Sequence, residues 1–212
     1  MSSVKLNDIW RSVNNEIGFY TSETFKDVPN TPGVYAWFYP LRILTKDIYE
    51  FINEVNAILD YDGIREAEID FKWEIITQNL EIKSKKINLT PFEGIWSEII
   101  TNGDDTEFNE LRKIIMRASI LLPPLYIGKT RNLNIRCQQH VNTAGGKNNF
   151  RARFEKYADE AYSNKKISKK IEVNDLLFVA IKTKEEDQLS TRTEELVESI
   201  LKHLSKPKYS EK

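Results

Sequence analysis

Arg136 and His140 are the pair whose types and spacing are best suited to acting on a phosphodiester. They stand four positions apart in a segment of helical periodicity, so both side chains project from one face, one turn from each other. An arginine can oppose negative charge on a phosphate, and a histidine can transfer a proton. Most surface pairs at this spacing are structural, so the pair by itself leaves both interpretations open.

Glu198 is the second candidate, and it lies in a helix predicted over 191–205. A lone carboxylate is a suitable hard-oxygen ligand for Mg²⁺, which keeps most of its water. Because Lys202 lies one turn further on, the other interpretation is an exposed ion pair that contributes roughly a few tenths of a kcal/mol. The predicted buried stripe of this helix lies away from Glu198 and consists of Leu196, Val197, Ile200, Leu201 and Leu204.

Tyr35 and Tyr126 stand within two apolar segments, 33–39 and 125–128, that have the composition of strands. Tyrosines in strands usually pack against the core and place the hydroxyl on a hydrogen-bond partner. The residues alone therefore favour a structural role for both tyrosines.

The distribution of charge points to a polyanion as partner of one part of the chain. Residues 1–120 hold 13 Lys and Arg against 20 Asp and Glu, whereas 121–212 hold 18 against 12, and 129–170 alone hold 11 against 3. A division of this kind is typical of proteins that meet nucleic acid on one surface. The arginines whose forked donors suit phosphate, beside Arg136, are Arg131, Arg151 and Arg153.

Composition excludes several classes of protein. The 212 residues are 40% hydrophobic and 30% charged, which is typical of a globular chain and too apolar for disorder. Cys137 is the single cysteine, so neither an internal disulfide nor a cysteine-based zinc site can form. With no apolar run long enough to span a bilayer and no signal-peptide pattern at the start, we expect a cytoplasmic protein with no membrane partner.

The elements that must position these residues follow from hydrophobic periodicity and turn signals. Outside 41–120 their order is strand, strand, helix, helix, strand, helix, preceded by a short amphipathic helix. The predicted helices are 5–19, 46–60, 91–101, 106–120, 132–141, 150–162 and 191–205, and the predicted strands are 33–39, 69–75, 80–89, 125–128 and 175–183.

Five short motifs follow one another along the chain. They are GVY at 33–35, YIGKT at 126–130, Arg136-x-x-x-His140, Glu198-x-x-Leu201, and KPKY at 206–209. In this order and with these local spacings, the chain resembles the GIY-YIG nucleases over 30–40 and 121–212. Each motif is weak alone, and the ordered set is what makes the resemblance specific.

The resemblance implies an α+β fold with a small antiparallel three-stranded sheet flanked by helices. The nuclease core would be 33–40 together with 121–212, preceded by an N-terminal helix and lead-in over 1–32. Residues 41–120, which separate two motifs that are usually close in the family, would form an inserted mixed α/β subdomain. Ser210 stands where the family often has an asparagine after the final tyrosine.

The resemblance also implies a role for each matching residue. Tyr35 as a phenolate would position or deprotonate the attacking water, and Tyr126 would bond water or phosphate. Arg136 would stabilise charge on the scissile phosphate, and His140 would handle a proton. Glu198 would bind the metal. Lys129, which directly follows Tyr126-Ile127-Gly128, would contact phosphate.

These expectations describe a metal-dependent endonuclease that hydrolyses phosphodiester bonds, with DNA as the expected substrate. One divalent cation, Mg²⁺ or Mn²⁺, would be held by Glu198 in a one-metal mechanism. A branched duplex or RNA remains open as target, as does a homodimer. The alternatives are a non-cleaving nucleic-acid-binding module or a protein-interaction protein that retains the nuclease core.

Overall fold

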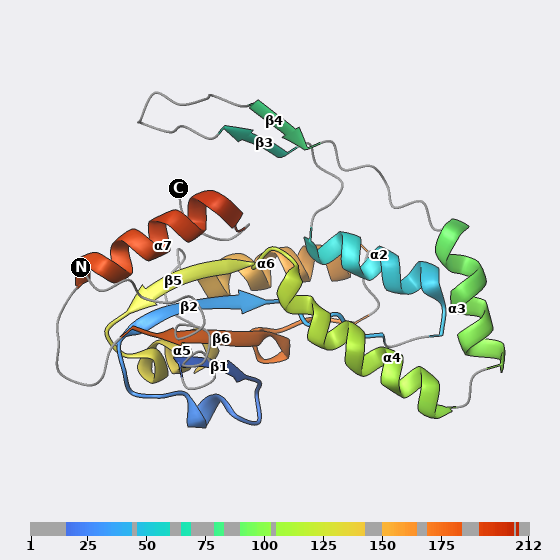
Figure 1. Cartoon of the computed structure of the whole chain (residues 1–212), viewed down its shortest axis with the longest axis horizontal. Coiled ribbons are helices and arrows are strands. Elements are labelled where there is room, and N and C mark those ends of the chain that lie inside the picture. The colour runs from blue at the N-terminus through green and yellow to red at the C-terminus, as the bar shows by residue number, and fades with distance from the viewer. Residues whose placement is uncertain are drawn as a thin grey trace, which may run out of the picture. The chain divides into compact units, whose positions relative to one another are not determined.

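A computed structural model gives the arrangement of most of the chain (Figure 1). It divides the chain into two compact units, residues 1–39, 122–157 and 171–212 in the first, and 40–121 with 158–170 in the second. None of the described helices is long and apolar enough to cross a membrane. The structure describes residues 16–43, 46–59, 65–68, 79–82, 90–102, 105–142, 150–164, 169–183, 191–205 and 207.

An antiparallel four-stranded sheet forms the centre of the first unit, in the order β1-β6-β2-β5. The central strand β2 pairs on one side with β5 and on the other with β6 (Figure 1). In this register Tyr35 lies opposite both Gly128 and Ala180. The strands are β1 (Ile17–Tyr20), β2 (Gly33–Phe38), β5 (Tyr126–Thr130) and β6 (Leu177–Lys182).

The α+β class agrees with the prediction, but the sheet has a fourth strand that the sequence did not reveal. The predicted helix over 5–19 is wrong at its end, because Ile17–Tyr20 is strand β1; residues 5–15 lie outside the described residues. Ile17, Phe19 and Tyr20 are β-branched or aromatic and suit a strand. Their pairing with the edge of β6, remote in sequence, outweighs the local helical pattern.

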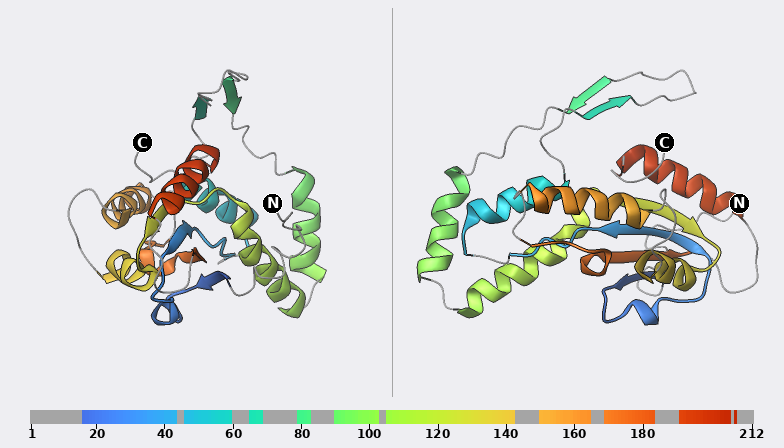
Figure 2. Two further views of the ribbon diagram at one scale, coloured as in Figure 1. Left: turned by 60° about the vertical axis from the view of Figure 1, so that its left-hand side comes forward. Right: turned by 180° about the vertical axis from the view of Figure 1, so that it is seen from behind.

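Two faces of the sheet carry different helices. Trp37, Tyr126 and Phe178 share one face with Tyr35. Phe150 at the start of α6 packs on the rings of Trp37 and Tyr126. The helix α5 packs beside β2, while α7 packs on β5 and β2 (Figure 2). The helices that contribute to this unit are α5 (Leu133–Asn142), α6 (Phe150–Ser163) and α7 (Thr191–Ser205), with short 3-10 turns η1 (Phe25–Asp27) and η3 (Val173–Asp175).

The second unit is built around a small aromatic cluster. Phe51 stacks on Trp96 with ring centroids 6.0 Å apart, and Phe108 meets Trp96 edge-on. Residues 69–75, predicted as a strand, lie outside the described residues, and so do 83–89 of the other predicted strand. The elements are α2 (Ile48–Leu59), a hairpin of β3 (Arg65–Glu68) and β4 (Asn79–Ile82), α3 (Thr90–Asn102), α4 (Asp105–Ala118) and η2 (Ser119–Leu121).

Candidate active site

The ring of Tyr35 can lie across β5 because the neighbouring residue of that strand, Gly128, has no side chain. A Cβ atom added to Gly128 would come within 2.5 Å of the Tyr35 hydroxyl oxygen and 2.8 Å of the Tyr126 ring. No side chain can therefore replace the hydrogen of Gly128 without moving the two rings. The glycine of the second motif is explained by this close approach.

The helix α5 brings Arg136 and His140 to the same ring. Asn132 caps the helix, because its side-chain oxygen accepts a hydrogen bond from the Ile135 backbone N–H at 2.9 Å. The Asn134 side chain then ties the first turn to the lead-in loop by donating to the Val28 carbonyl at 2.8 Å. These contacts fix the face that α5 turns to β2.

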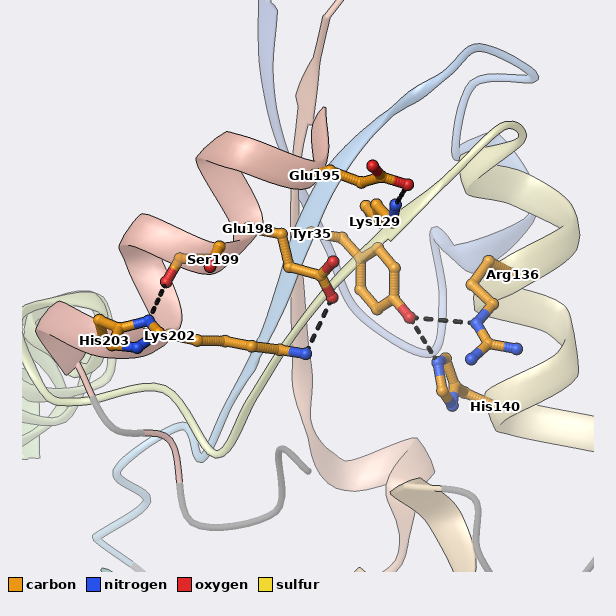
Figure 3. Close-up of polar contacts among 9 residues, drawn as sticks. All are labelled: Tyr35, Lys129, Arg136, His140, Glu195, Glu198, Ser199, Lys202 and His203. Carbon is orange, nitrogen blue, oxygen red and sulfur yellow. Dashed lines mark hydrogen bonds and ion pairs between the residues drawn. The ribbon is translucent and has the colours of Figure 1, made fainter. Parts of the chain in front are cut away.

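Tyr35 joins Arg136 and His140 in one hydrogen-bonded group (Figure 3). Nε of Arg136 donates to the Tyr35 hydroxyl at 3.1 Å, and that hydroxyl lies 2.9 Å from Nε2 of His140. Gln139 accepts a hydrogen bond from Nη1 of Arg136 at 3.1 Å, which orients the guanidinium. Sequence reasoning did not single out Gln139, although its position one turn from Arg136 is a signal for such a contact.

Tyr126 completes the cluster from β5. Its ring centroid lies 5.9 Å from that of Tyr35 and 5.7 Å from that of His140. Tyr126 also acts electrostatically on Tyr35 and on Arg136. The structure thus brings together four of the five predicted catalytic residues, from segments separated by about one hundred positions, and we call Tyr35, Tyr126, Arg136 and His140 the tyrosine cluster.

Burial keeps both Tyr35 and His140 uncharged in the resting tyrosine cluster. Burial raises the pKa of the Tyr35 phenol well above its ordinary value. Burial, helped by the positive charges of Arg136 and Arg153, lowers the pKa of His140 to about 3. At neutral pH His140 is therefore an uncharged imidazole, and it can accept the Tyr35 hydroxyl proton at Nε2 while Arg136 donates to the same oxygen.

Access to the tyrosine cluster is uneven. Tyr35 is 1% exposed and His140 is 2% exposed. Tyr126 and Arg136 are half-buried, so they are the members that an incoming group meets first.

Glu198 is not part of the tyrosine cluster. Its side chain is 16% exposed and pairs with Lys202 at 3.0 Å. Neighbouring side chains of a strand point to opposite faces, and Lys129, next to Gly128 in β5, forms an ion pair with Glu195 of α7. The helix α7 therefore covers the face of the sheet opposite to the Tyr35 ring. Figure 3 shows Glu198 extending from α7, and Arg136 and His140 extending from α5.

The helix α7 turns a mixed polar and apolar side inward, so the predicted buried stripe is right only in part: Val197 and Leu201 are half-buried, and the other members are exposed. Glu194 is 5% exposed and accepts a hydrogen bond from the Thr183 hydroxyl at 2.7 Å. Periodicity reveals an apolar stripe but not which side of the helix meets the sheet; here polar contacts with Thr183 and Lys129 fix that side. The members of the predicted stripe that are exposed are Leu196 at 62%, Ile200 at 48% and Leu204 at 71%.

The four predicted phosphate contacts have different surroundings. Lys129 is engaged by Glu195, and Arg131 is exposed. Arg151 pairs with Glu155 at 2.7 Å and donates to the Val141 carbonyl, so it ties α6 to the end of α5. Arg153, half-buried on α6, acts electrostatically on His140.

The carboxylates could hold a metal ion only where water and a substrate phosphate supply its other ligands. Among the residues that the structure describes, no three His, Cys, Asp or Glu side chains gather closely enough to hold a metal ion. Mg²⁺ usually binds through one or two carboxylates, several waters and a substrate phosphate. The half-buried carboxylate of Glu198 fits this donor set as its single protein ligand.

Comparison with known proteins gives no relative from which a role could be transferred. No protein-family model, no curated protein and no solved structure matches this chain. The assignment of function therefore depends on the motifs and on the geometry of the site.

Proposed function

We propose that this chain is a metal-dependent endonuclease of the GIY-YIG type that hydrolyses phosphodiester bonds in DNA. The observation that carries the proposal is the tyrosine cluster. A neutral phenol held between a guanidinium and an uncharged imidazole provides charge stabilisation and proton transfer at one point. Packing alone does not require an arginine and a histidine on one tyrosine hydroxyl.

Arg136 and Tyr126 receive the scissile phosphate, because they are the half-buried members of the tyrosine cluster. Arg136 is already oriented by Gln139 and Tyr35, so it opposes the new negative charge on the phosphate without reorganising. Removing one such pre-oriented donor from an enzyme typically reduces kcat by about 10²–10³-fold.

The attacking water loses its proton along the hydrogen bonds of the tyrosine cluster. The water gives a proton to the Tyr35 hydroxyl as Tyr35 passes its own proton to Nε2 of His140. The water oxygen forms a bond to phosphorus while the bond to the leaving oxygen breaks, and the leaving oxygen takes a proton from solvent. His140 ends the step as an imidazolium.

Glu198 would hold the divalent cation, Mg²⁺ or Mn²⁺, which would supply polarisation of the phosphate and stabilisation of the leaving oxygen. In this proposal the carboxylate of Glu198 on α7 would meet, through the cation, the phosphate that Arg136 and Tyr126 receive.

The burial of Tyr35 and His140 favours a second candidate, a module that binds nucleic acid without cleaving it. In such a module the tyrosine cluster would hold the sheet and α5 together, and the basic residues would supply the binding. The charge excess of 129–170 serves both candidates equally.

Incubation of the full chain with labelled duplex, branched and RNA substrates, with Mg²⁺ or with a chelator, tests the proposal. We expect Mg²⁺-dependent cleavage that Glu198→Gln abolishes and Tyr35→Phe slows, while binding persists. Glu110→Gln, which breaks an exposed ion pair with Lys113 in the second unit, is the matched control and should cleave normally. Binding without cleavage by the unaltered chain would establish the second candidate, and neither activity would refute both.

A further inference from the structure

The ion pair of Glu198 and Lys202 differs from an ordinary surface pair in its burial. Both residues lie on α7 at i and i+4, and their side chains are only 16% and 27% exposed. The pair formed by Glu110 and Lys113 on α4 is 54% exposed on each side. Solvent therefore screens the attraction between Glu198 and Lys202 much less.

Lys202 is not needed to turn Glu198 toward the sheet. The inward side of α7 is already fixed by the hydrogen bond from Thr183 to Glu194 and by the ion pair of Lys129 with Glu195. With the helix in this orientation, Leu196, Ile200 and Leu204 are exposed. The orientation of Glu198 thus follows from the helix, and what Lys202 contributes is a positive charge at the carboxylate.

We propose that Lys202 is the resident counter-ion of Glu198, and that a divalent cation must displace its ammonium group to reach the carboxylate. This inference rests on the proposed function, in which Glu198 is the metal ligand. While the ammonium group occupies an oxygen of the carboxylate, it repels an approaching cation and competes for the same lone pairs. The long flexible stem of lysine lets the ammonium group swing away once the cation arrives.

Binding of Mn²⁺ to the full chain, followed by water-proton relaxation without nucleic acid, separates metal binding from cleavage. Lys202→Met keeps the apolar stem and removes the charge, so we expect about tenfold tighter binding of Mn²⁺. Lys202→Arg keeps the charge and should bind no more tightly than the unaltered chain. Lys113→Met, which removes the exposed lysine of α4, is the matched control and should leave the affinity unchanged.

The double variant Glu198→Gln with Lys202→Met identifies the carboxylate concerned. This double variant should not show the tighter Mn²⁺ binding expected of Lys202→Met, because the carboxylate that Lys202 covers is then absent. Near-ultraviolet circular dichroism checks the fold of each variant, and Lys202→Gln replaces Lys202→Met if the latter unfolds.

The outcomes distinguish this inference from the proposed function. If Glu198→Gln weakens Mn²⁺ binding but the neutral Lys202 variants do not tighten it, Glu198 remains a metal ligand and the inference about Lys202 is wrong. If Glu198→Gln leaves Mn²⁺ binding unchanged in every background, both the inference and the metal site of the proposed function are overturned. An equal gain in Mn²⁺ affinity in Lys113→Met would also overturn the inference, since the gain would then come from the change in net charge and not from the position of Lys202.

Discussion

Replacement of His140 by glutamine should remove a specific dependence of folding stability on pH. His140 is 2% exposed, and its pKa falls from an ordinary 6.5 to about 3 in the folded chain. Between these values the unfolded chain binds a proton at this position and the folded chain does not. Stability is therefore fully present above pH 6.5 and declines as the pH falls toward 3, by about 1.4 kcal/mol per pH unit.

From this slope we expect His140 to account for a loss of about 2 kcal/mol in the free energy of unfolding between pH 7.5 and pH 5.0. Urea denaturation at both pH values, followed by circular dichroism, measures the loss for the unaltered chain and for His140→Gln. The glutamine cannot titrate, yet it can still hydrogen-bond to Tyr35. The loss of unfolding free energy in His140→Gln should therefore be smaller than that of the unaltered chain by about 2 kcal/mol.

His203, the other histidine of the chain, provides the matched control because it lies exposed on α7. His203→Gln should lose as much stability between the two pH values as the unaltered chain does. The reasoning would be refuted by equal losses in His140→Gln and the unaltered chain, since the buried imidazole would then not resist protonation.

Four further replacements test the site. Glu198→Gln should abolish Mg²⁺-dependent cleavage in a gel assay, while affinity for duplex DNA stays within a few-fold of normal. Tyr35→Phe, which removes the hydroxyl shared by Arg136 and His140, should slow single-turnover cleavage by about 10²–10³-fold. Arg151→Ala should cost about 1–3 kcal/mol of stability in urea and leave the salt dependence of binding unchanged, because Arg151 already holds partners within the protein. Arg131→Ala should instead flatten the fall of log affinity with log salt by about 0.9, since Arg131 is exposed and suits one phosphate.

Most elements of the fold could be predicted because their signals are local. The strand at 33–38 shows its aromatic and β-branched residues between glycine and proline, and the helices at 105–118 and 191–205 begin and end at residues typical of helix termini. The strand Ile17–Tyr20 could not be predicted because four residues are too few to establish a period. Its partner on β6 lies about 160 positions away, and only the folded chain brings the two together.

The tyrosine cluster could be anticipated, but the orientation of α7 could not. Spacing places Arg136 and His140 on one helix face, and the ordered motifs place Tyr35 and Tyr126 on paired strands. The helix α7, by contrast, has an apolar side and a charged side, and the hydrophobic effect alone predicts that the apolar side is buried. Contacts of Glu194 with Thr183 and of Glu195 with Lys129, which no local pattern identifies, instead hold the helix with only Val197 and Leu201 of that side half-buried.

Burial and two positive charges together keep His140 without a proton while the site is empty of anions. Burial contributes most to the lowered pKa of His140, and Arg136 and Arg153 lower it further. A phosphate beside Arg136 brings negative charge that offsets the contribution of the guanidinium groups and so moves the pKa of His140 upward, while the contribution of burial remains. In the proposed mechanism, His140 therefore accepts a proton more readily when a phosphate is bound. The two arginines thus couple proton transfer to the presence of substrate.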